Sequence, residues 1–416
     1  MKMLIPVLMT ASLWAQQPRP FDVVLKGGHV IDPKNGIDHV ADVAIRDGTV
    51  VQIADSLPDE SAQKVISVDG LFVVPGLVDI HTHLFHGTEE DADYSNGFSA
   101  ISPDSFSFRS GVTTMVDAGG SGWRNFKQFK RQTIDRSQTR VLAFLNIVGN
   151  GMKGGPIEQD LSDMDARLTA MRASEFKPLI VGVKVAHYNG AGWEPVDRAV
   201  EAGRIAGIPV MIDFGSHQPP LSLRQLLLDH LRPGDFLTHA YADAQGREAI
   251  VGGDGTVKPF VREARQKGVL FDVGHGAGSF VWRQVVPAMA SDFPPDTIST
   301  DLHVHSMNAG MKDLLNVMSK FLNLGMPLQE AVLRTTWAPA RVIGHQELGH
   351  LSPGAEADIT VLNLRRGSFG FIDAEGAMIP GNQKLECELV LRAGHVVWDL
   401  NGRAARKWQD PASGRP

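Results

Sequence analysis

The middle of this 416-residue chain alternates between short apolar runs and helix-length amphipathic segments, and this alternation limits the folds open to it. Runs such as Leu179-Ile-Val-Gly-Val183 are continuously apolar, as in parallel strands buried on both faces. Segments such as 195–206 and 311–324 have helical length. Strands are predicted to end near His83, Asp117, Val148, Lys184, Asp213, His239, His275 and Asp301. Eight such units over about 250 residues predict an α/β fold, a (β/α)₈ barrel of the TIM type.

The two ends of the chain differ from this middle part because both are rich in β-branched residues and turn signals. Between Phe21 and about Pro75, short apolar runs are separated by Gly27-Gly28 and Asp47-Gly48, dipeptides typical of hairpins. A similar pattern returns near the C-terminus. We therefore predict one small β-sandwich built from both termini, with two unrelated β extensions as the alternative. The predicted domains are residues 21–75 and 346–404 for the sandwich and 76–345 for the barrel.

The first fifteen residues have the composition of a secretory signal. Lys2 is followed by an apolar stretch from Met3 to Trp14, then by Ala15 and a polar segment that contains proline. This order predicts a signal peptide over residues 1–15 and a periplasmic or secreted protein, with a cytoplasmic protein as the alternative. The apolar stretch is too short to be a stable membrane anchor.

Charge and cysteine content exclude several classes of function. The formal net charge is −7 and no basic run occurs, so nucleic acid is not an expected partner. The single cysteine, Cys387, rules out an internal disulfide and a cysteine-rich zinc site. Barrel enzymes place their chemistry at the carboxyl ends of the strands, which is therefore where functional side chains are to be sought.

Two histidines, His81 and His83, close the first predicted barrel strand. Positions i and i+2 of a strand point to the same side, so both imidazoles emerge together and can bind one metal ion. A pair of surface histidines beside a turn is the alternative for an isolated His-x-His. Suitable metal partners recur at the ends of later strands, and the metal site is therefore favoured.

Three further candidate ligands end later strands. Lys184 ends the fourth, and a buried ammonium needs a partner, either a carboxylate or carboxylation by carbon dioxide to a carbamate that bridges two metal ions. His239 ends the sixth strand and Asp301 the eighth, and each alone could have a structural role. Together these nitrogen and oxygen donors predict a catalytic metal centre, and the carbamate is favoured by the histidine pair.

The sequence resembles the amidohydrolase superfamily over nearly its whole length after the leader. The resemblance rests on residues 21–28, the signature Pro75-Gly-Leu-Val-Asp-Ile-His-Thr-His83 and residues 354–361. Within the superfamily it is most similar to the deacetylase branch often labelled dihydroorotase-like, through residues 272–276 and 299–308. The resemblance implies a metal-dependent barrel with a small composite β-sandwich. Because such barrels commonly pair, it also implies a homo-oligomer.

The resemblance implies a binuclear site. One divalent ion would be held by His81, His83 and Asp301, and a second, bridged by carboxylated Lys184, would have His239 among its ligands. The family normally adds a histidine at the end of strand five. Zinc is the expected metal at both positions.

At strand five the sequence departs from the family pattern. Asp213 stands at the matching position, and His217 follows four residues later. We predict Asp213 as the ligand because it keeps the strand register; His217 reaching in from the loop is the alternative, with Asp213 then in a supporting role. An additional carboxylate also makes a harder metal such as Mn²⁺ an option.

This site predicts a metal-dependent hydrolase in which a metal-bridging hydroxide attacks a carbonyl and Asp301 is the general base. The resemblance to the deacetylase branch implies a small acylated acid as the substrate, an N-acyl amino acid or an O-acyl 2-hydroxy acid that loses an acyl, most simply acetyl, group. Substrate contacts are expected from His275, His187, Tyr188 and His303.

Two other functions remain open from the sequence. One is cyclic-amide hydrolysis of the dihydroorotase or hydantoinase type. Dihydroorotases follow the histidine pair with an arginine two residues on, whereas this chain has Phe85 there, which argues against dihydroorotase itself. The other is a catalytically silent metal-containing binding protein. Such a protein would lack the general base or the bridging lysine. Both Asp301 and Lys184 are present, which argues against this function.

Overall fold

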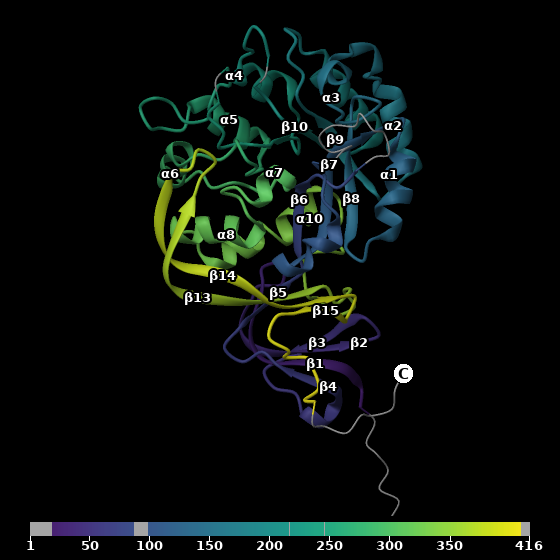
Figure 1. Cartoon of the computed structure of the whole chain (residues 1–416), viewed down its shortest axis with the longest axis vertical. Coiled ribbons are helices and arrows are strands. Elements are labelled where there is room, and N and C mark those ends of the chain that lie inside the picture. Colours follow the sequence, from purple (N-terminus) through teal and green to yellow (C-terminus); the bar gives the residue numbers. More distant parts are fainter. Residues whose placement is uncertain (1–18, 87–98, 216, 245, 409–416) are drawn as a thin grey trace, which may run out of the picture.

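The computed structural model describes residues 19–86, 99–215, 217–244 and 246–408; the predicted signal peptide lies outside these ranges. Figure 1 shows a barrel with its helices above and a sheet of terminal strands below. Within the described ranges, no helix is both long and apolar enough to cross a lipid bilayer.

A curled parallel sheet forms the barrel. Its seven strands lie side by side in sequence order, and every neighbouring pair is parallel. They are β6 (Leu77–Thr82), β7 (Val112–Gly122), β8 (Arg140–Asn146), β9 (Ile180–Val185), β10 (Val210–Ile212), β11 (Phe236–Leu237) and β12 (Leu270–Phe271). The predicted barrel architecture of the TIM type is therefore present.

The eighth barrel segment is reduced to two isolated parallel bridges, Asp272 with Thr297 and Thr82 with Leu302, which link residues 297–302 to both edges of the sheet. A continuous ladder does not form there. The Thr300 backbone N–H donates to the Asp79 carboxylate at 3.1 Å, and Asp301 has a left-handed φ of 52°. Individual backbone hydrogen bonds, such as Gly276 N to Thr300 O at 2.8 Å and His83 N to Leu302 O at 2.9 Å, still join this segment to its neighbours.

Helices follow the strands and cover the outside of the barrel (Figure 1). The predicted helix 195–206 corresponds to α3 (Glu194–Ala206), and the predicted helix 311–324 corresponds to α8 (Leu314–Asn323). The later start of α8 follows from Asp313, which caps the helix by accepting from Asn316 N at 2.7 Å. The others are α1 (Phe126–Gln132), α2 (Ala166–Glu175), α4 (Leu223–Gln225), α5 (Pro259–Lys267), α6 (Trp282–Ala290), α7 (Val304–Met307), α9 (Leu328–Leu333) and α10 (Trp337–Val342).

Strands from both ends of the chain form one mixed sheet, in the order β15-β14-β13-β5-β1-β2-β3, with β4 paired to β1. Strand β5 pairs with β1 on one side and with β13 on the other, so the ends are not unrelated extensions. A sandwich is not confirmed, because one hydrogen-bonded path links these strands. They are β1 (Phe21–Asp32), β2 (Ile37–Arg46), β3 (Thr49–Ala54), β4 (Ala62–Ser67), β5 (Phe72–Pro75), β13 (Ile359–Ile372), β14 (Met378–Arg392) and β15 (His395–Asp399).

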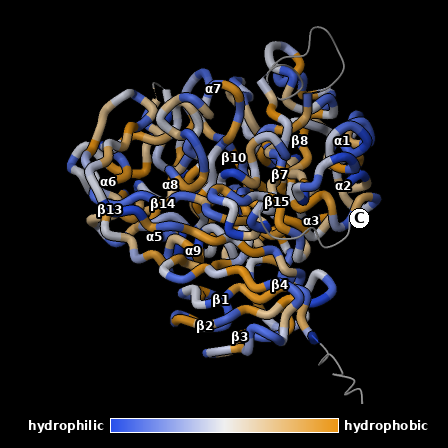
Figure 2. The backbone as a smooth tube through the Cα atoms, turned by 60° about the horizontal axis from the view of Figure 1, so that its bottom comes forward, coloured by the Kyte–Doolittle hydropathy of each residue, from blue (hydrophilic) through white to orange (hydrophobic). Residues whose placement is uncertain are grey.

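The terminal sheet has its own apolar core, to which strands from both ends contribute Val30, Val43, Ile66 and Leu389, all fully buried. Figure 2 shows this hydrophobic character along β1 and β4. The far end of the β13–β14 hairpin instead packs on the barrel helix α8. The barrel and the terminal sheet are thus joined through buried contacts, to which Phe371 and Leu385 contribute.

Candidate metal centre

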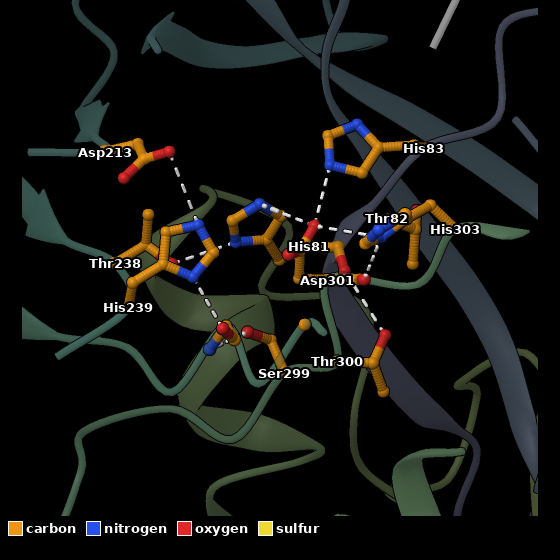
Figure 3. A network of polar contacts seen from close by, with 12 residues as sticks. His81, Thr82, His83, Asp213, Thr238, His239, Ser299, Thr300, Asp301 and His303 are labelled. Atoms are coloured by element: carbon orange, nitrogen blue, oxygen red, sulfur yellow. Dashed lines mark hydrogen bonds and ion pairs between the residues drawn. The ribbon is translucent and has the colours of Figure 1, made fainter. Parts of the chain in front are cut away.

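The predicted histidine pair lies at the carboxyl end of β6 and faces Asp301. The Asp301 Oδ1 atom is 2.8 Å from His83 Nε2 and 3.6 Å from His81 Nε2. Burial lowers the pKa of His81 to about 4 and that of His83 to about 3. Both rings are therefore neutral near pH 7 and can offer a nitrogen lone pair to a metal ion (Figure 3).

A group with metal-ligand spacing is formed by side chains from three distant parts of the sequence. One ligand atom each from His81, His239 and Asp301 lies within 4.8 Å of the other two, and all three residues are buried. Burial acts to raise the pKa of Asp301, but the neighbouring His303, His81 and His83 hold it well below its usual value. Asp301 is therefore an ionised carboxylate surrounded by imidazole rings.

Lys184 is buried beside this group and has no acidic partner among the residues that the structure describes. Its Nζ atom lies 3.2 Å from His81 Nε2 and 3.7 Å from Met211 Sδ. Among the described residues, no carboxylate oxygen lies within ion-pair distance of it. Burial lowers the pKa of Lys184, although the more distant carboxylates of Asp213 and Asp301 oppose this effect. A buried amine with a lowered pKa is more readily neutral and hence nucleophilic.

Asp213, directly after β10, occupies the second side of the site. Its Oδ2 atom is 3.5 Å from His239 Nε2 and 3.9 Å from His187 Nε2, while its Oδ1 atom is 3.3 Å from Arg247 Nη1. Burial acts to raise the pKa of Asp213, but the charges of His239, Arg247 and Lys184 hold it well below its usual value.

The alternative strand-five ligand, His217, has a different environment. Its ring lies among aromatic side chains, with ring centroids 5.2 Å from Phe214 and 6.3 Å from both Trp193 and Tyr188. Its buried Nδ1 atom has no hydrogen-bond partner within the described part of the chain. The geometry therefore favours Asp213 over His217 as the group that faces His239.

The predicted substrate contacts His187 and Tyr188 lie on the loop after β9. The His187 Nδ1 atom is 2.8 Å from the buried carboxylate of Glu158, and His187 has a left-handed φ of 56°. His187 lines an open hollow of about 670 Å³ together with residues 154–160 and Asn189. Tyr188 is half-buried beside the ring of His217. His187 thus lies between this hollow and Asp213.

The two other predicted substrate contacts differ in position. His303 Nδ1 lies 3.7 Å from Asp301 Oδ1, at the site. The ring of His275 instead stacks on Phe280 and its Nε2 atom is 2.5 Å from Lys320 Nζ, while its Nδ1 atom is 2.9 Å from a backbone carbonyl. Both ring nitrogens of His275 thus have protein partners in this structure, and its contact with a substrate stays a prediction.

Several buried polar residues around the site were missed by sequence reasoning. Asp272 accepts hydrogen bonds from the hydroxyls of Thr238, Thr297 and Ser299, and the Thr238 hydroxyl lies 2.9 Å from His81 Nδ1. This chain of contacts fixes the ring orientation of His81. The other missed residues are Asp79, Asp117, Glu158 and Arg247. A charged side chain inside or directly after an apolar strand is the signal that could have revealed the aspartates.

Comparison with known proteins agrees with this geometry. The family model described as "Amidohydrolase family" matches residues 282–397. A deacetylase of Agrobacterium fabrum is 32% identical over 337 residues, which cover 79% of this chain and 80% of that protein. The crystal structure of an adenine deaminase aligns with a TM-score of 0.81 and 25% identity, covering 91% of this chain and 100% of that one.

A dihydroorotase crystal structure is similar to the same extent, with a TM-score of 0.80 and 29% identity over 91% of this chain and 99% of the other. These similarities span the barrel as well as the terminal sheet. Taken with the histidine pair and the strand-end ligands, they show that the chain belongs to the amidohydrolase family and is a hydrolytic enzyme.

Proposed function

We propose that the protein is a binuclear metal-dependent deacylase that removes an acetyl group from a small N-acyl amino acid or O-acyl 2-hydroxy acid. The observation that carries this proposal is the group formed by His81, His239 and Asp301, whose ligand atoms lie within 4.8 Å of one another beside the buried amine of Lys184. The similarity to a deacetylase over four fifths of both chains supports the reaction class.

The donor atoms fit two divalent ions. His81, His83 and Asp301 would hold one, while His239, Asp213 and a carboxylated Lys184 would hold the other. A carbamate on Lys184 explains why this amine is buried beside an imidazole instead of a carboxylate. Ions bound there would polarise an acyl carbonyl and make a water molecule nucleophilic near neutral pH.

The protein's own part in the reaction falls mainly to Asp301. Asp301 is ionised, so its carboxylate oxygens are available to accept a proton from the attacking water. It can pass that proton to the nitrogen or oxygen of the leaving group.

Two features of the surroundings support the proposed substrate class. Phe85 is 1% exposed and packs on Phe129 with a ring separation of 5.1 Å, so no cation occupies the position where a dihydroorotase has its arginine. His187, with its ring held by Glu158, lies at the hollow beside the site and is the imidazole we assign to the substrate acid group.

The test combines metal analysis by mass spectrometry with hydrolysis of a panel of N-acetyl amino acids, O-acetyl 2-hydroxy acids, dihydroorotate and a hydantoin. We expect about two equivalents of metal, activity on the acetylated acids, and loss of activity on chelation. Activity on the cyclic amides alone would replace the deacylase with a cyclic-amide hydrolase. Two bound metals with no activity on any compound would favour the binding protein.

A further inference from the structure

One buried arginine links the two candidate ligands at strands five and six. The Arg247 side chain is 9% exposed, and its Nη1 atom is 3.3 Å from Asp213 Oδ1. Its Nη2 group donates to the backbone carbonyls of Thr238 at 3.1 Å and His239 at 2.9 Å. A single rigid guanidinium therefore fixes the Asp213 carboxylate relative to the backbone that carries His239.

The chain leaves space for this arginine at Gly215. A Cβ atom on Gly215 would lie 2.6 Å from Arg247 Cγ and 2.7 Å from its Cβ, closer than side-chain carbons approach one another. Gly215 also has a φ of 125°, which side-chain-bearing residues rarely adopt. The backbone two residues after Asp213 is thus shaped around the Arg247 side chain.

The contacts of Asp213 divide between its two oxygens. Oδ1 faces Arg247, which leaves Oδ2 directed toward His239 Nε2 at 3.5 Å and His187 Nε2 at 3.9 Å. The charges also balance. An aspartate in place of a neutral histidine lowers the charge of the site by one, and the guanidinium restores it.

We propose that Arg247 is a positioning residue for the metal centre, and that the Asp213–Arg247 ion pair does the work of a neutral histidine ligand at the end of strand five. Arg247 aims Oδ2 of Asp213 at the position of the second ion and offsets the additional negative charge. This inference rests on the proposed binuclear centre and concerns how its second ion is held.

The test compares Arg247→Met, Asp213→His and the double variant, in which both members of the pair are replaced. Arg247→Met leaves Asp213 without its Oδ1 partner, and Asp213→His leaves a buried cation without a counter-charge. We expect each single variant to bind the second equivalent of zinc about 10- to 100-fold more weakly, measured by titration against a competing chelator. The double variant should recover to within about threefold of the wild-type affinity.

Folding and non-specific effects are controlled by two further variants. Arg247→Lys keeps the positive charge but loses the planar guanidinium, whose two Nη groups contact Asp213 and the backbone carbonyls. This variant should bind the second ion with intermediate affinity. Arg265→Met removes another half-buried arginine from its ion pair with Asp296, 3.2 Å away, and should leave zinc affinity unchanged. Circular dichroism and thermal midpoints identify any variant that fails to fold; Arg247→Lys then carries the test.

Wild-type second-ion affinity in both Arg247→Met and Arg247→Lys would overturn the inference, as would a double variant as weak as the product of the two single effects. If wild-type activity is measurable, Arg247→Met should also move the acidic limb of the pH profile of kcat/KM to higher pH. Removal of a nearby positive charge raises the pKa of the groups that must be deprotonated for activity. The zinc titration needs no substrate. Failure of the deacylase proposal therefore shows in the panel, and failure of this inference shows in the metal affinities.

Discussion

At the scale of single residues, the site depends on burial as much as on chemical identity. His81 and His83 are 1% and 2% exposed, and this burial keeps both rings neutral. Asp301 is also buried but remains ionised, because the neighbouring imidazoles hold its pKa below the usual value. The same environment thus prepares the histidines as lone-pair donors and the aspartate as an anionic oxygen donor.

Replacing Asp301 by asparagine should lower kcat by about 10²–10⁴-fold, because an amide cannot accept the proton from the attacking water. Steady-state hydrolysis of the best acetylated substrate measures this loss. The matched control is Asp313→Asn, which changes a carboxylate that caps α8 and lies outside the site. An Asp301→Asn variant with near wild-type kcat would remove Asp301 from the role of base.

Asp272 should matter for metal binding without being a ligand. Through Thr238 it fixes the ring of His81, so Asp272→Asn should weaken zinc binding by about tenfold. A competition titration with a chelator measures the change. Asp296→Asn, which alters an aspartate that accepts from Phe271 N, is the control and should have no effect on zinc binding. Equal zinc affinity in Asp272→Asn and wild type would contradict the supporting role.

At the scale of elements, a buried lysine joins helix α8 to two neighbours. Lys320 is 0% exposed and donates to the carbonyls of Gly310 at 2.8 Å and Ile372 at 2.7 Å, and its Nζ atom is 2.5 Å from His275 Nε2. It thereby ties the end of β13 to the loop after β12. The next residue in that loop, Gly276, approaches Asp301 so closely that a Cβ would lie 2.3 Å from Oδ2. The packing of helix α8 thus contacts the loop that lies against Asp301.

Lys320 should give the protein a pH-dependent stability. Burial lowers the pKa of Lys320 from 10.5 to about 7. Between these values the unfolded chain binds more protons than the folded one, so the free energy of unfolding should rise with pH across this window and be independent of this group below it. Thermal midpoints of wild type and Lys320→Met at a series of pH values measure the difference, because the variant lacks this contribution.

The control for this measurement is Lys258→Met, which removes a lysine that pairs with Glu248 at 2.9 Å and should keep the wild-type pH dependence. Parallel pH curves for wild type and Lys320→Met would show that Lys320 keeps the same pKa in the folded and the unfolded chain.

At the scale of the whole molecule, charged residues join the barrel to the terminal sheet. Arg140, at the start of β8, pairs with both Glu356 and Asp358 just before β13, and its contact with Asp358 is 2.6 Å long. Arg392 of β14 contacts the same two carboxylates. The network is 11–39% exposed, so it is only partly screened by water.

Arg140→Met should lower the free energy of unfolding by about 1–3 kcal/mol, because two half-buried carboxylates lose a charged hydrogen-bond donor. Urea unfolding followed by circular dichroism measures this change. Arg204→Met, which breaks an exposed pair with Glu201 on α3, should change stability less. If the two variants lost the same stability, the network would contribute no more than a surface ion pair.

The sequence by itself determined the barrel and most of the strand-end residues. Continuous apolar runs alternating with helix-length segments are typical of buried parallel strands, and the alternation of side chains along a strand sends His81 and His83 to one side. These are local properties, so they can be recognised without a fold. The observed strands end within a few residues of the predicted positions, for example β6 at Thr82 and β9 at Val185.

Tertiary structure alone decided which partners these residues have. Arg247 reaches Asp213 across 34 positions, and Lys320 reaches His275 across 45. No sequence pattern reveals either pair. Arginine and lysine usually lie at the surface, so neither residue by itself suggests a buried partner. The pairing of the terminal strands was likewise decided by tertiary structure, because β5 and β13 are far apart in the sequence. The local sequence pattern determines the secondary structure and the side of a strand on which a residue lies. Long-range packing determines which residues it contacts, and these contacts set the protonation state of its side chain.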